Sequence, residues 1–291
     1  MAINFQKQSF SQMRFKGLQM VKQTINGLNL LLKKNCHKLL KTSMDRFKDK
    51  TVIVTGAGSG IGKSTAIRLD AEGAQLIIID INEEQLDTTL SLLKNEASSS
   101  HVLNIASPEE TKKFFQNLKN NNKKLDALVN VAGILRFDNS HEVEIENWNK
   151  ILEVNLTGTF FMCRYALPFL LESEGAIVNV SSSAAIGAHA WTSAYSASKG
   201  GISAFSKTLA VEYGMRGLNV NCVCPASIQT PMSTNPEMPK DIDTRLLKKI
   251  MPLDGVNRSP DDIASTIAFL ASEDAIHING IDLRVDGGLL T

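Results

Sequence analysis

The chain has 291 residues, 43% of them hydrophobic, which is enough for one large domain with a substantial core. Its net charge of +1 is uneven: residues 1–43 carry eight Lys or Arg and no acid, and the rest holds 23 basic and 30 acidic residues. An acidic main body argues against a nucleic-acid partner. The four cysteines and five histidines form no ligand pattern, so we expect no metal and a reducing, cytoplasmic location.

Residues 1–43 are expected to be an extension outside the domain, either disordered or an amphipathic helix. Their apolar stripe suits a helix that contacts an anionic membrane or a partner, or an organelle-targeting leader, although Arg14 is the only arginine. Because Met44 directly precedes the first predicted strand, an unstructured tail or a translation start at Met44 is preferred over membrane contact. No run of 18 apolar residues exists, so no membrane span is predicted. The stripe comprises Leu18, Val21, Ile25, Leu28, Leu32 and Leu39.

Residues 51–72 predict a strand, a glycine loop and a helix. Residues 51–55 are β-branched throughout, which is typical of a strand buried on both faces. The glycines that follow allow a tight turn and let a ligand approach the backbone. The N-terminus of the helix at 61–72 offers unpaired N–H groups that suit a pyrophosphate. The loop glycines are Gly56, Gly58, Gly60 and Gly62.

Two phosphate-binding interpretations of this loop compete. The spacing G-x-x-x-G-x-G from Gly56 to Gly62 belongs to one dinucleotide-binding class. The spacing A-x-x-x-x-G-K-S from Ala57 to Ser64 approaches a P-loop, with alanine in place of the first glycine. The loop alone does not decide between them, and the dinucleotide is the preferred guest.

A carboxylate at the end of the second predicted strand favours NAD. Residues 75–79 are nearly all apolar and end in Asp80, 18 residues beyond Gly62, where a carboxylate suits hydrogen bonds to both ribose hydroxyls of an adenosine. It also repels a 2′-phosphate, because like charges about 4 Å apart cost on the order of 4 kcal/mol at an effective dielectric constant of 20. Position 59, where an arginine would bind that phosphate, is Ser59. NAD is therefore preferred over NADP, although an ordinary solvated aspartate would show the same pattern.

The third strand is predicted to be short. Residues 82–97 indicate a helix, 98–100 a turn and 101–105 a strand. Asn104 near the end of that strand either offers its amide to an adenine edge or is only a turn residue.

A further helix and strand lead to a run of small residues. Ser107 followed by Pro108 is typical of a helix start. Residues 125–131 predict a buried strand that runs into Asn130-Val-Ala-Gly133. Small residues at the carboxyl end of a strand allow a cofactor ring to pack against the backbone, although a plain turn has the same composition.

Polar residues then appear where apolar ones are expected. Residues 144–171 indicate a long helix interrupted by Asn155, Gly158 and Pro168, and Asn155 in mid-helix is unfavourable unless its side chain has a specific partner. Residues 175–181 predict a fifth buried strand, which places Ser181, Ser182 and Ser183 at its carboxyl end.

A tyrosine and a lysine share one face of the next predicted helix, 195–214. Tyr195 and Lys199 are four residues apart. A phenol with a pKa of about 10 transfers protons poorly at neutral pH. A lysine cation about 4–5 Å away is expected to lower that pKa by roughly two to three units, into the range of efficient general acid–base catalysis.

These features resemble the classical short-chain dehydrogenase/reductase family from about Arg46 through Leu290, with only the N-terminal extension uncovered. So many family motifs in the same order are very improbable by chance, and this argues against the alternative that residues 57–64 form a P-loop. The matching pieces are Thr55-Gly56-x-x-x-Gly60-x-Gly62, Asp80, Asn130-x-Ala132-Gly133, Asn155, Ser182, Tyr195-x-x-x-Lys199 and Val285-Asp286-Gly-Gly288.

The resemblance implies a role for each catalytic residue. Tyr195 would exchange a proton with the substrate oxygen, and Ser182 would hydrogen-bond to that oxygen, so both would bind substrate. Lys199 would bind the nicotinamide ribose and lower the tyrosine pKa, and Asn155 would hold a water between Lys199 and solvent. The expected cofactor-binding residues are Gly56, Ser59, Gly60, Ile61, Gly62, Asp80, Asn104, Ile105, Asn130, Ala132, Gly133, Tyr195, Lys199, Pro225, Ile228 and Thr230.

Three positions depart from the family pattern. Residues 218–224 predict a sixth strand, and Ala226 stands where the family usually has glycine after the following proline. Val131 replaces a second asparagine, and Asn104 replaces a more usual aspartate. We expect the last two to be tolerated, whereas Ala226 is a small change that can shift how its loop meets the nicotinamide.

Residues 231–256 correspond to the substrate lid of the family. The segment is rich in proline and contains three methionines, which suit an adaptable apolar pocket. Together with Leu135 and residues 184–186, they indicate an apolar or weakly polar alcohol or ketone. Surface positions are preferred over substrate contacts for His189 and Arg136.

We predict an α/β fold, a single doubly wound Rossmann-type domain over residues 44–291. Its seven-stranded parallel sheet is expected in the family order 3-2-1-4-5-6-7, with helices on both faces and the cofactor across the carboxyl ends of the strands. A helix that begins after Ser259 and a last strand at 281–285 complete it. The helices at 144–171 and 195–214 resemble the family's tetramer-forming pair, so a homotetramer is expected.

The predicted function is oxidation of a small secondary alcohol by NAD, or reduction of the ketone by NADH. The nearest alternative is an NADP-linked 3-oxoacyl carrier-protein reductase of the same fold. An alternative of another class is a non-catalytic scaffold that kept the dinucleotide site. The presence of all four expected catalytic residues argues against the scaffold.

Overall fold

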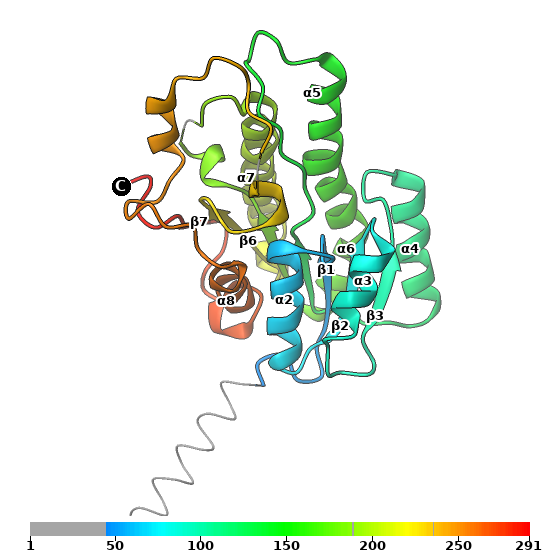
Figure 1. Ribbon diagram of the computed structural model, residues 1–291. Coiled ribbons are helices and arrows are strands. Elements are labelled where there is room, and N and C mark those ends of the chain that lie inside the picture. The colour runs from blue at the N-terminus through cyan, green and yellow to red at the C-terminus, as the bar shows by residue number, and fades with distance from the viewer. Residues whose placement is uncertain (1–44, 188, 235) are drawn as a thin grey trace, which may run out of the picture. The chain divides into compact units, whose positions relative to one another are not determined.

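The β-branched and apolar runs of the sequence pair into one parallel sheet in the order β3-β2-β1-β4-β5-β6-β7, as predicted (Figure 1). The computed structural model describes residues 45–187, 189–234 and 236–291, so the predictions for residues 1–43 lie outside the described residues. Residues Arg46–Thr291 form one unit. The strands are β1 (Thr51–Thr55), β2 (Gln75–Asp80), β3 (Ser99–Val102), β4 (Ala127–Asn130), β5 (Ala176–Val180), β6 (Asn219–Pro225) and β7 (Asp282–Val285).

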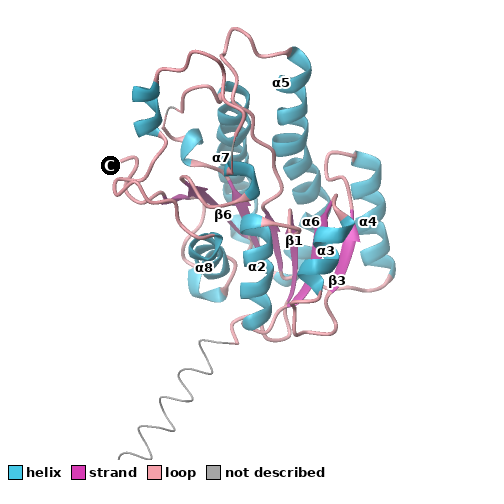
Figure 2. Cartoon of the chain, viewed as in Figure 1, coloured by secondary structure: helices cyan, strands magenta, loops and turns pink. Residues whose placement is uncertain are grey.

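Helices cover both faces of this sheet (Figure 2). Alternate side chains of a strand point to opposite faces, so Val52 and Val54 of β1 pack into one apolar cluster and Ile53 into another. Helices α2, α3 and α8 contribute to the first cluster, and α4, α6 and α7 to the second. The helices are α2 (Gly60–Ala71), α3 (Glu83–Leu90), α4 (Pro108–Asn120), α5 (Ile145–Leu152), α6 (Gly158–Ser173), α7 (Ser193–Tyr213) and α8 (Pro260–Leu270).

Local signals located the helix starts well. Ser107 precedes α4 and its hydroxyl accepts a hydrogen bond from the Glu110 N–H at 3.3 Å, with Pro108 in the first turn. Ser259 does the same for α8, accepting from the Asp261 N–H at 3.2 Å. Both caps supply acceptors for N–H groups that have no partner inside the helix.

Two boundaries were predicted wrongly, and tertiary contacts explain both. β3 covers Ser99–Val102 rather than 101–105, because an edge strand needs only main-chain pairing with β2 and tolerates serines where a turn was expected. Helix α3 ends at Leu90 instead of continuing to 97. The buried carboxylate of Asp70 on α2 accepts hydrogen bonds from the N–H groups of Lys94 and Asn95, both at 2.9 Å, and so holds the chain in a non-helical path.

The long helix predicted at 144–171 is interrupted at Asn155. Helices α5 and α6 are joined by a π-helical turn, Glu153–Thr157, with Asn155 fully buried inside it. Such turns widen the helix and are often found at functional sites. Among the helices that the described residues form, none is both long and apolar enough for a membrane span.

Candidate active site

The loop between β1 and α2 requires its glycines for steric reasons. Gly56 has a φ of +67°, and a Cβ there would lie 2.8 Å from the main chain of Ala132. A Cβ on Gly62 would lie 2.1 Å from the carbonyl oxygen of Gly56, closer than any side chain allows. The Thr55 hydroxyl accepts hydrogen bonds from the N–H groups of Val131 at 3.1 Å and Ala132 at 3.2 Å, which joins the ends of β1 and β4. The loop is therefore tightly held against the end of β4.

The carboxylate of Asp80 is held beside this loop by three main-chain donors. Its Oδ2 accepts from the Gly58 N–H at 3.0 Å, and its Oδ1 accepts from Ile81 at 2.8 Å and Asn82 at 3.1 Å. A Cβ on Gly58 would lie 2.9 Å from Oδ2. The structure thus places a fixed negative charge next to the glycine loop.

A first cavity of about 490 Å³ lies along the glycine loop and the carboxyl ends of β1, β2 and β4. Its walls include most of the residues predicted to bind the cofactor. These are Gly56, Ser59, Gly60, Ile61, Gly62, Asp80, Asn104, Ile105, Ala132, Gly133, Tyr195, Lys199 and Thr230.

Three of the predicted cofactor residues do not line this cavity. Asn130 is buried and its amide nitrogen donates to Asn179 Oδ1 at 2.8 Å and to Cys163 Sγ at 3.3 Å, because its side chain points into the core rather than toward the strand end. Pro225 and Ile228 line a second cavity instead.

Sequence reasoning also missed residues of the first cavity. Lys150 and Val154, one helical turn apart, and Gln85 line it. The sequence carries no signal for Lys150, since an exposed lysine on a helix has the same pattern whether or not a cavity lies beside it. The approach of α5 to the end of β4 puts this lysine there.

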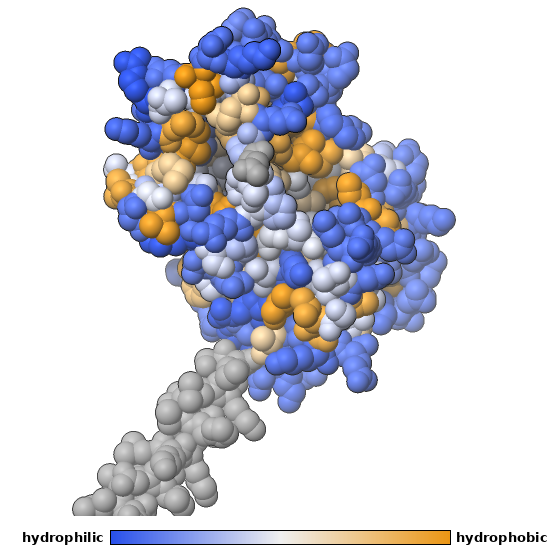
Figure 3. Space-filling view, viewed as in Figure 1, coloured by the Kyte–Doolittle hydropathy of each residue, from blue (hydrophilic) through white to orange (hydrophobic). Residues whose placement is uncertain are grey.

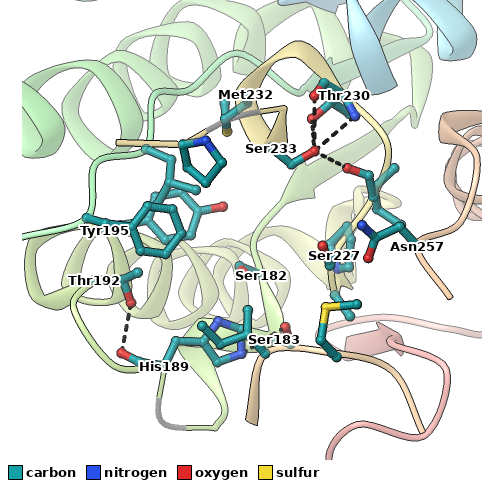
Figure 4. A pocket seen from close by; sticks show the side chains of 18 of the residues that line it. Ser182, Ser183, His189, Thr192, Tyr195, Ser227, Thr230, Met232, Ser233 and Asn257 are labelled. Atoms are coloured by element: carbon teal, nitrogen blue, oxygen red, sulfur yellow. Dashed lines mark hydrogen bonds between the residues drawn. The ribbon is translucent and has the colours of Figure 1, made fainter. Parts of the chain in front are cut away.

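The second cavity, of about 440 Å³, lies between the end of β5 and the predicted lid. Hydrophobic side chains gather beside a hollow in the upper half of the face in Figure 3. In close view, the Tyr195 hydroxyl points into this cavity, near Ser182 (Figure 4). The two cavities share five lining residues: Ile61, Val180, Tyr195, Thr230 and Met232. A ligand in one cavity would therefore meet a ligand in the other beside Tyr195.

The lid prediction can be compared with the walls of this cavity. Met232, Met238 and Met251 all line it, as does Leu135, whereas residues 184–186 do not. His189 was expected at the surface but lines the cavity, with its ring Nε2 3.3 Å from the Ser183 hydroxyl.

His189 and Arg136, both predicted to lie at the surface, differ in how far they are buried. Burial lowers the pKa of His189, which favours the neutral ring. Arg136 is half exposed, and its Nε pairs with the Asp138 carboxylate at 3.1 Å. The surface prediction was therefore wrong for His189, whose segment folds back over the cavity.

Lys199 is buried under the site. Its ammonium donates to the carbonyl oxygen of Val180 at 2.7 Å and lies 5.7 Å from the centre of the Tyr195 ring. Ser182 begins a short turn after β5, where its hydroxyl accepts from the Ala184 N–H at 3.1 Å. A hydrogen-bond contact from Ser182 also acts on the Tyr195 phenol.

The predicted lowering of the Tyr195 pKa is not found in the protein alone. Burial raises the pKa of the phenol, and the contact with Ser182 opposes that shift only in part. Burial also lowers the pKa of Lys199 to about 8, so the lysine is still mostly protonated at pH 7 but loses its charge above about pH 8. The sequence argument took the lysine to be fully charged and neglected the loss of hydration on both groups.

Burial of the Lys199 ammonium is expected to lower the stability of the folded protein. The unfolded chain holds the Lys199 proton up to a pKa of 10.5 and the folded chain only to about 8, so the unfolded state binds more protons between these values. Stability should therefore rise with pH across this window, by an amount on the order of 3 kcal/mol. We expect Lys199→Met to raise the melting temperature at pH 7 by roughly 2–6 °C, after some loss from the unpaired Val180 carbonyl.

Melting curves recorded from pH 7 to 10 would test this. Lys112→Met, an exposed lysine on α4, is the matched control and should change little. A Lys199→Met protein that melts lower than wild type at pH 7 would contradict the idea that burial of this charge is costly.

Asn155 holds the segment after β4 in place. Its Oδ1 accepts from the Ile134 N–H at 2.8 Å, and its Nδ2 donates to the Ile134 carbonyl at 2.9 Å and to the Ser198 hydroxyl at 3.1 Å. Gly133 lies between it and Lys199, since a Cβ there would be 3.1 Å from Asn155 Oδ1 and 3.5 Å from the lysine nitrogen. The four predicted catalytic side chains therefore gather around one point, although Asn155 hydrogen-bonds to Ile134 and Ser198 rather than to Lys199.

Comparison with known proteins identifies the class of enzyme to which the chain is similar. A family model described as "Enoyl-(Acyl carrier protein) reductase" matches residues 56–290. The chain is 33% identical over 244 residues to the meso-2,3-butanediol dehydrogenase of Serratia marcescens, covering 84% of this chain and 95% of that protein. It is 35% identical over 251 residues to the 3-oxoacyl-(acyl-carrier-protein) reductase of Thermotoga maritima, covering 84% and 99%. The crystal structure of the carveol dehydrogenase from Mycobacterium avium in complex with NAD is similar with a TM-score of 0.76 at 27% identity, covering 84% of this chain and 99% of that chain.

The fold, the glycine loop and these similarities define a dinucleotide-dependent oxidoreductase. The chain belongs to the classical short-chain dehydrogenase/reductase family, as its sequence motifs predicted.

Proposed function

We propose that the protein interconverts a small secondary alcohol and its ketone with NAD as the cofactor. The observation that carries this proposal is the position of Tyr195 where two cavities meet, with Ser182 in the substrate cavity and Lys199 in the dinucleotide cavity. The bound cofactor would accept a hydride at its nicotinamide ring as NAD, or donate one as NADH. The chain itself must position the two partners and move one proton.

Tyr195 is the group that moves this proton. Because burial keeps its pKa high, the phenol is protonated at neutral pH and is ready to donate to a ketone oxygen. Ser182 orients the same oxygen by a hydrogen bond. Alcohol oxidation needs the phenolate, so its rate should increase with pH. Lys199 lines the dinucleotide cavity and, when charged, stabilises the phenolate as it forms.

Asn155 is assigned to the proton path as a positioning residue. Its side chain fixes Ile134 and so the segment after β4, which lines the first cavity beside Lys199. A water held beside this asparagine would link the lysine to solvent, which is the role that the family resemblance implies.

The first cavity suits NAD better than NADP. The glycine cradle offers main-chain N–H groups at the start of α2 to a pyrophosphate, and Asp80 presents a fixed carboxylate to the adenosine ribose. A 2′-phosphate would meet that carboxylate at Ser59, which brings no positive charge. The carveol dehydrogenase structure, which contains NAD, supports the same choice.

A 3-oxoacyl carrier-protein reductase remains the second candidate. The similarity to the Thermotoga maritima enzyme favours it. Against it stands Asp80, whose fixed carboxylate disfavours the 2′-phosphate of NADP.

The proposal is tested by a panel of secondary alcohols and ketones, read by NADH absorbance, with NAD and NADP compared at equal concentration. We expect turnover of at least one small alcohol with NAD. Activity only with NADPH and 3-oxoacyl thioesters would favour the second candidate, and the absence of any turnover would favour a binding scaffold.

We also propose a homotetramer of domains that span residues 44–291, with 231–256 as the substrate lid. Helices α6 and α7 carry exposed apolar side chains, including Phe160 and Val211, the latter 84% exposed in the single chain. Light scattering should give four times the 31.8 kDa chain mass. Val211→Glu should reduce that mass, whereas Ile276→Glu, a similarly exposed residue outside these helices, should not. An unchanged tetramer in Val211→Glu would place the interface elsewhere.

The proposed location is the cytoplasm. Cys163, Cys222 and Cys224 are free and buried, which suits a reducing compartment. Membrane contact by residues 1–43 stays the less favoured proposal.

A further inference from the structure

Most polar side chains around the substrate cavity are already hydrogen-bonded to the protein. The Thr192 hydroxyl donates to the His189 carbonyl at 3.0 Å, and the Ser233 hydroxyl contacts Thr230 and donates to the Ile228 carbonyl at 2.5 Å. Such groups have little capacity left for a ligand. The polar character of the cavity therefore depends on the few groups that are not engaged.

Two neutral polar side chains of the cavity wall, other than Ser182 and Tyr195, have no hydrogen-bond partner among the described residues. Asn257 and Ser227 both line the cavity, and neither side chain makes a hydrogen bond to another residue in the described part of the chain. Within that same part, Asn257 Oδ1 is one of three buried side-chain oxygen or nitrogen atoms without a partner. A buried amide that lacks its hydrogen bonds is costly and usually indicates a missing partner.

These two groups lie side by side, across the cavity from Tyr195 (Figure 4). The wall of the same cavity also includes the apolar side chains of Leu247, Ile250 and Met251. A substrate whose reacting carbon is at Tyr195 would thus have an apolar body in the middle and its far end at Asn257. The volume, about 440 Å³, is at the small end for ligand pockets.

We infer that the substrate carries a second hydroxyl group, separated from the reacting carbon by an apolar body, which Asn257 and Ser227 bind. This inference rests on the proposed function. A hydroxyl suits the pair because it can donate to the amide oxygen and accept from the amide nitrogen or the serine. A charged end group does not suit it, because no Lys, Arg, Asp or Glu of the described residues lines the cavity. The substrate class is therefore a compact neutral diol, or the corresponding hydroxyketone.

The inference is tested with ring alcohols of one size. Full-length protein with NAD is assayed by NADH absorbance on cyclohexanol and on the cis and trans isomers of 1,2-, 1,3- and 1,4-cyclohexanediol. The rigid ring places the second hydroxyl at known distances from the reacting carbon. We expect at least one diol to exceed cyclohexanol in kcat/KM by roughly 10- to 100-fold, the effect of pairing an otherwise unpaired buried polar group.

Variants assign this preference to the two residues. Asn257→Leu keeps the side-chain size and removes the amide, and it should bring the ratio of kcat/KM for the best diol to that for cyclohexanol close to one. Ser227→Ala should lower the same ratio by a smaller factor. Leu247→Met is the matched control, an apolar exchange on the same wall, and it should leave the ratio within about twofold.

Cyclohexanol used as well as, or better than, every diol would overturn the inference, and so would an unchanged ratio in Asn257→Leu. In both cases NADH formation from cyclohexanol would still support the proposed function. If Asn257→Leu does not fold, as judged by circular dichroism, Ser227→Ala decides, and an unchanged ratio there overturns the inference. No turnover of any secondary alcohol or ketone would defeat the proposed function and this inference with it.

Discussion

Tyr195→Phe is expected to lower kcat by about 10²–10⁴-fold, the usual contribution of a positioned general acid or base. The variant removes one oxygen atom and leaves the ring, which is packed at the junction of the two cavities. Without the phenol, no other side chain at the junction can pass a proton to the substrate oxygen, since Ser182 only donates a hydrogen bond and Lys199 is directed to the Val180 carbonyl. NADH absorbance measures the rate, and NAD titration by fluorescence should show binding close to that of wild type.

Tyr213→Phe is the matched control for this variant. Tyr213 ends α7, the same helix, and lies outside both cavities. It should retain wild-type kcat. Retained activity in Tyr195→Phe, with normal NAD binding, would show that the proton moves by another route and would reopen the assignment of the whole site.

Asp80→Asn is expected to decrease the preference for NAD over NADP by about 10- to 10³-fold in kcat/KM. The upper figure follows from about 4 kcal/mol between like charges about 4 Å apart, and salt and partial exposure reduce it. Asparagine has the shape of aspartate but only one carbonyl oxygen, so it should keep the bonds from Ile81 and Asn82 and lose the one from Gly58. Kinetics with both cofactors, at low and high ionic strength, measure the effect.

The preference of the wild type is itself part of this prediction. Equal or better use of NADPH by the wild type would contradict the role given to Asp80. Asp87→Asn, an exposed carboxylate on α3, removes the same charge from the same region and should leave the cofactor preference unchanged. A shift of similar size in Asp87→Asn would mean that overall charge, rather than contact with the ribose, governs the choice.

The most reliable predictions from the sequence were those that depend on local conformation and steric limits of the backbone. The β-branched run 51–55 is a strand because it can be buried on both faces, and it lies inside the sheet between β2 and β4. Three glycines of the loop, Gly56, Gly58 and Gly62, are required by contacts below 3 Å that any side chain would make, and Gly60 has a φ of +50°. The spacing of Tyr195 and Lys199 places both on one helical face, which the structure turns toward the cavities.

Predictions failed where a side chain depends on neighbours that are distant in sequence. Asn130 lies at a strand end, as expected, but its side chain pairs with that of Asn179, its register partner on the neighbouring strand β5. The phenol of Tyr195 has a raised pKa because the surrounding elements exclude water from it. His189 faces a cavity because its segment folds back, and nothing in its flanking residues indicates that.

The sequence by itself therefore predicted the strands and the glycine cradle, which follow from periodicity and steric limits. It also supplied the candidate catalytic residues and the strand order through its resemblance to the family. Only the tertiary structure decided which residues share a wall, how far each charge is buried and where Asn257 lies relative to Tyr195. Those properties arise when segments as distant as 182, 195 and 257 surround one volume. The residues that surround this cavity, rather than the local sequence, then set how well each side chain is hydrated and which hydrogen-bond partners it has.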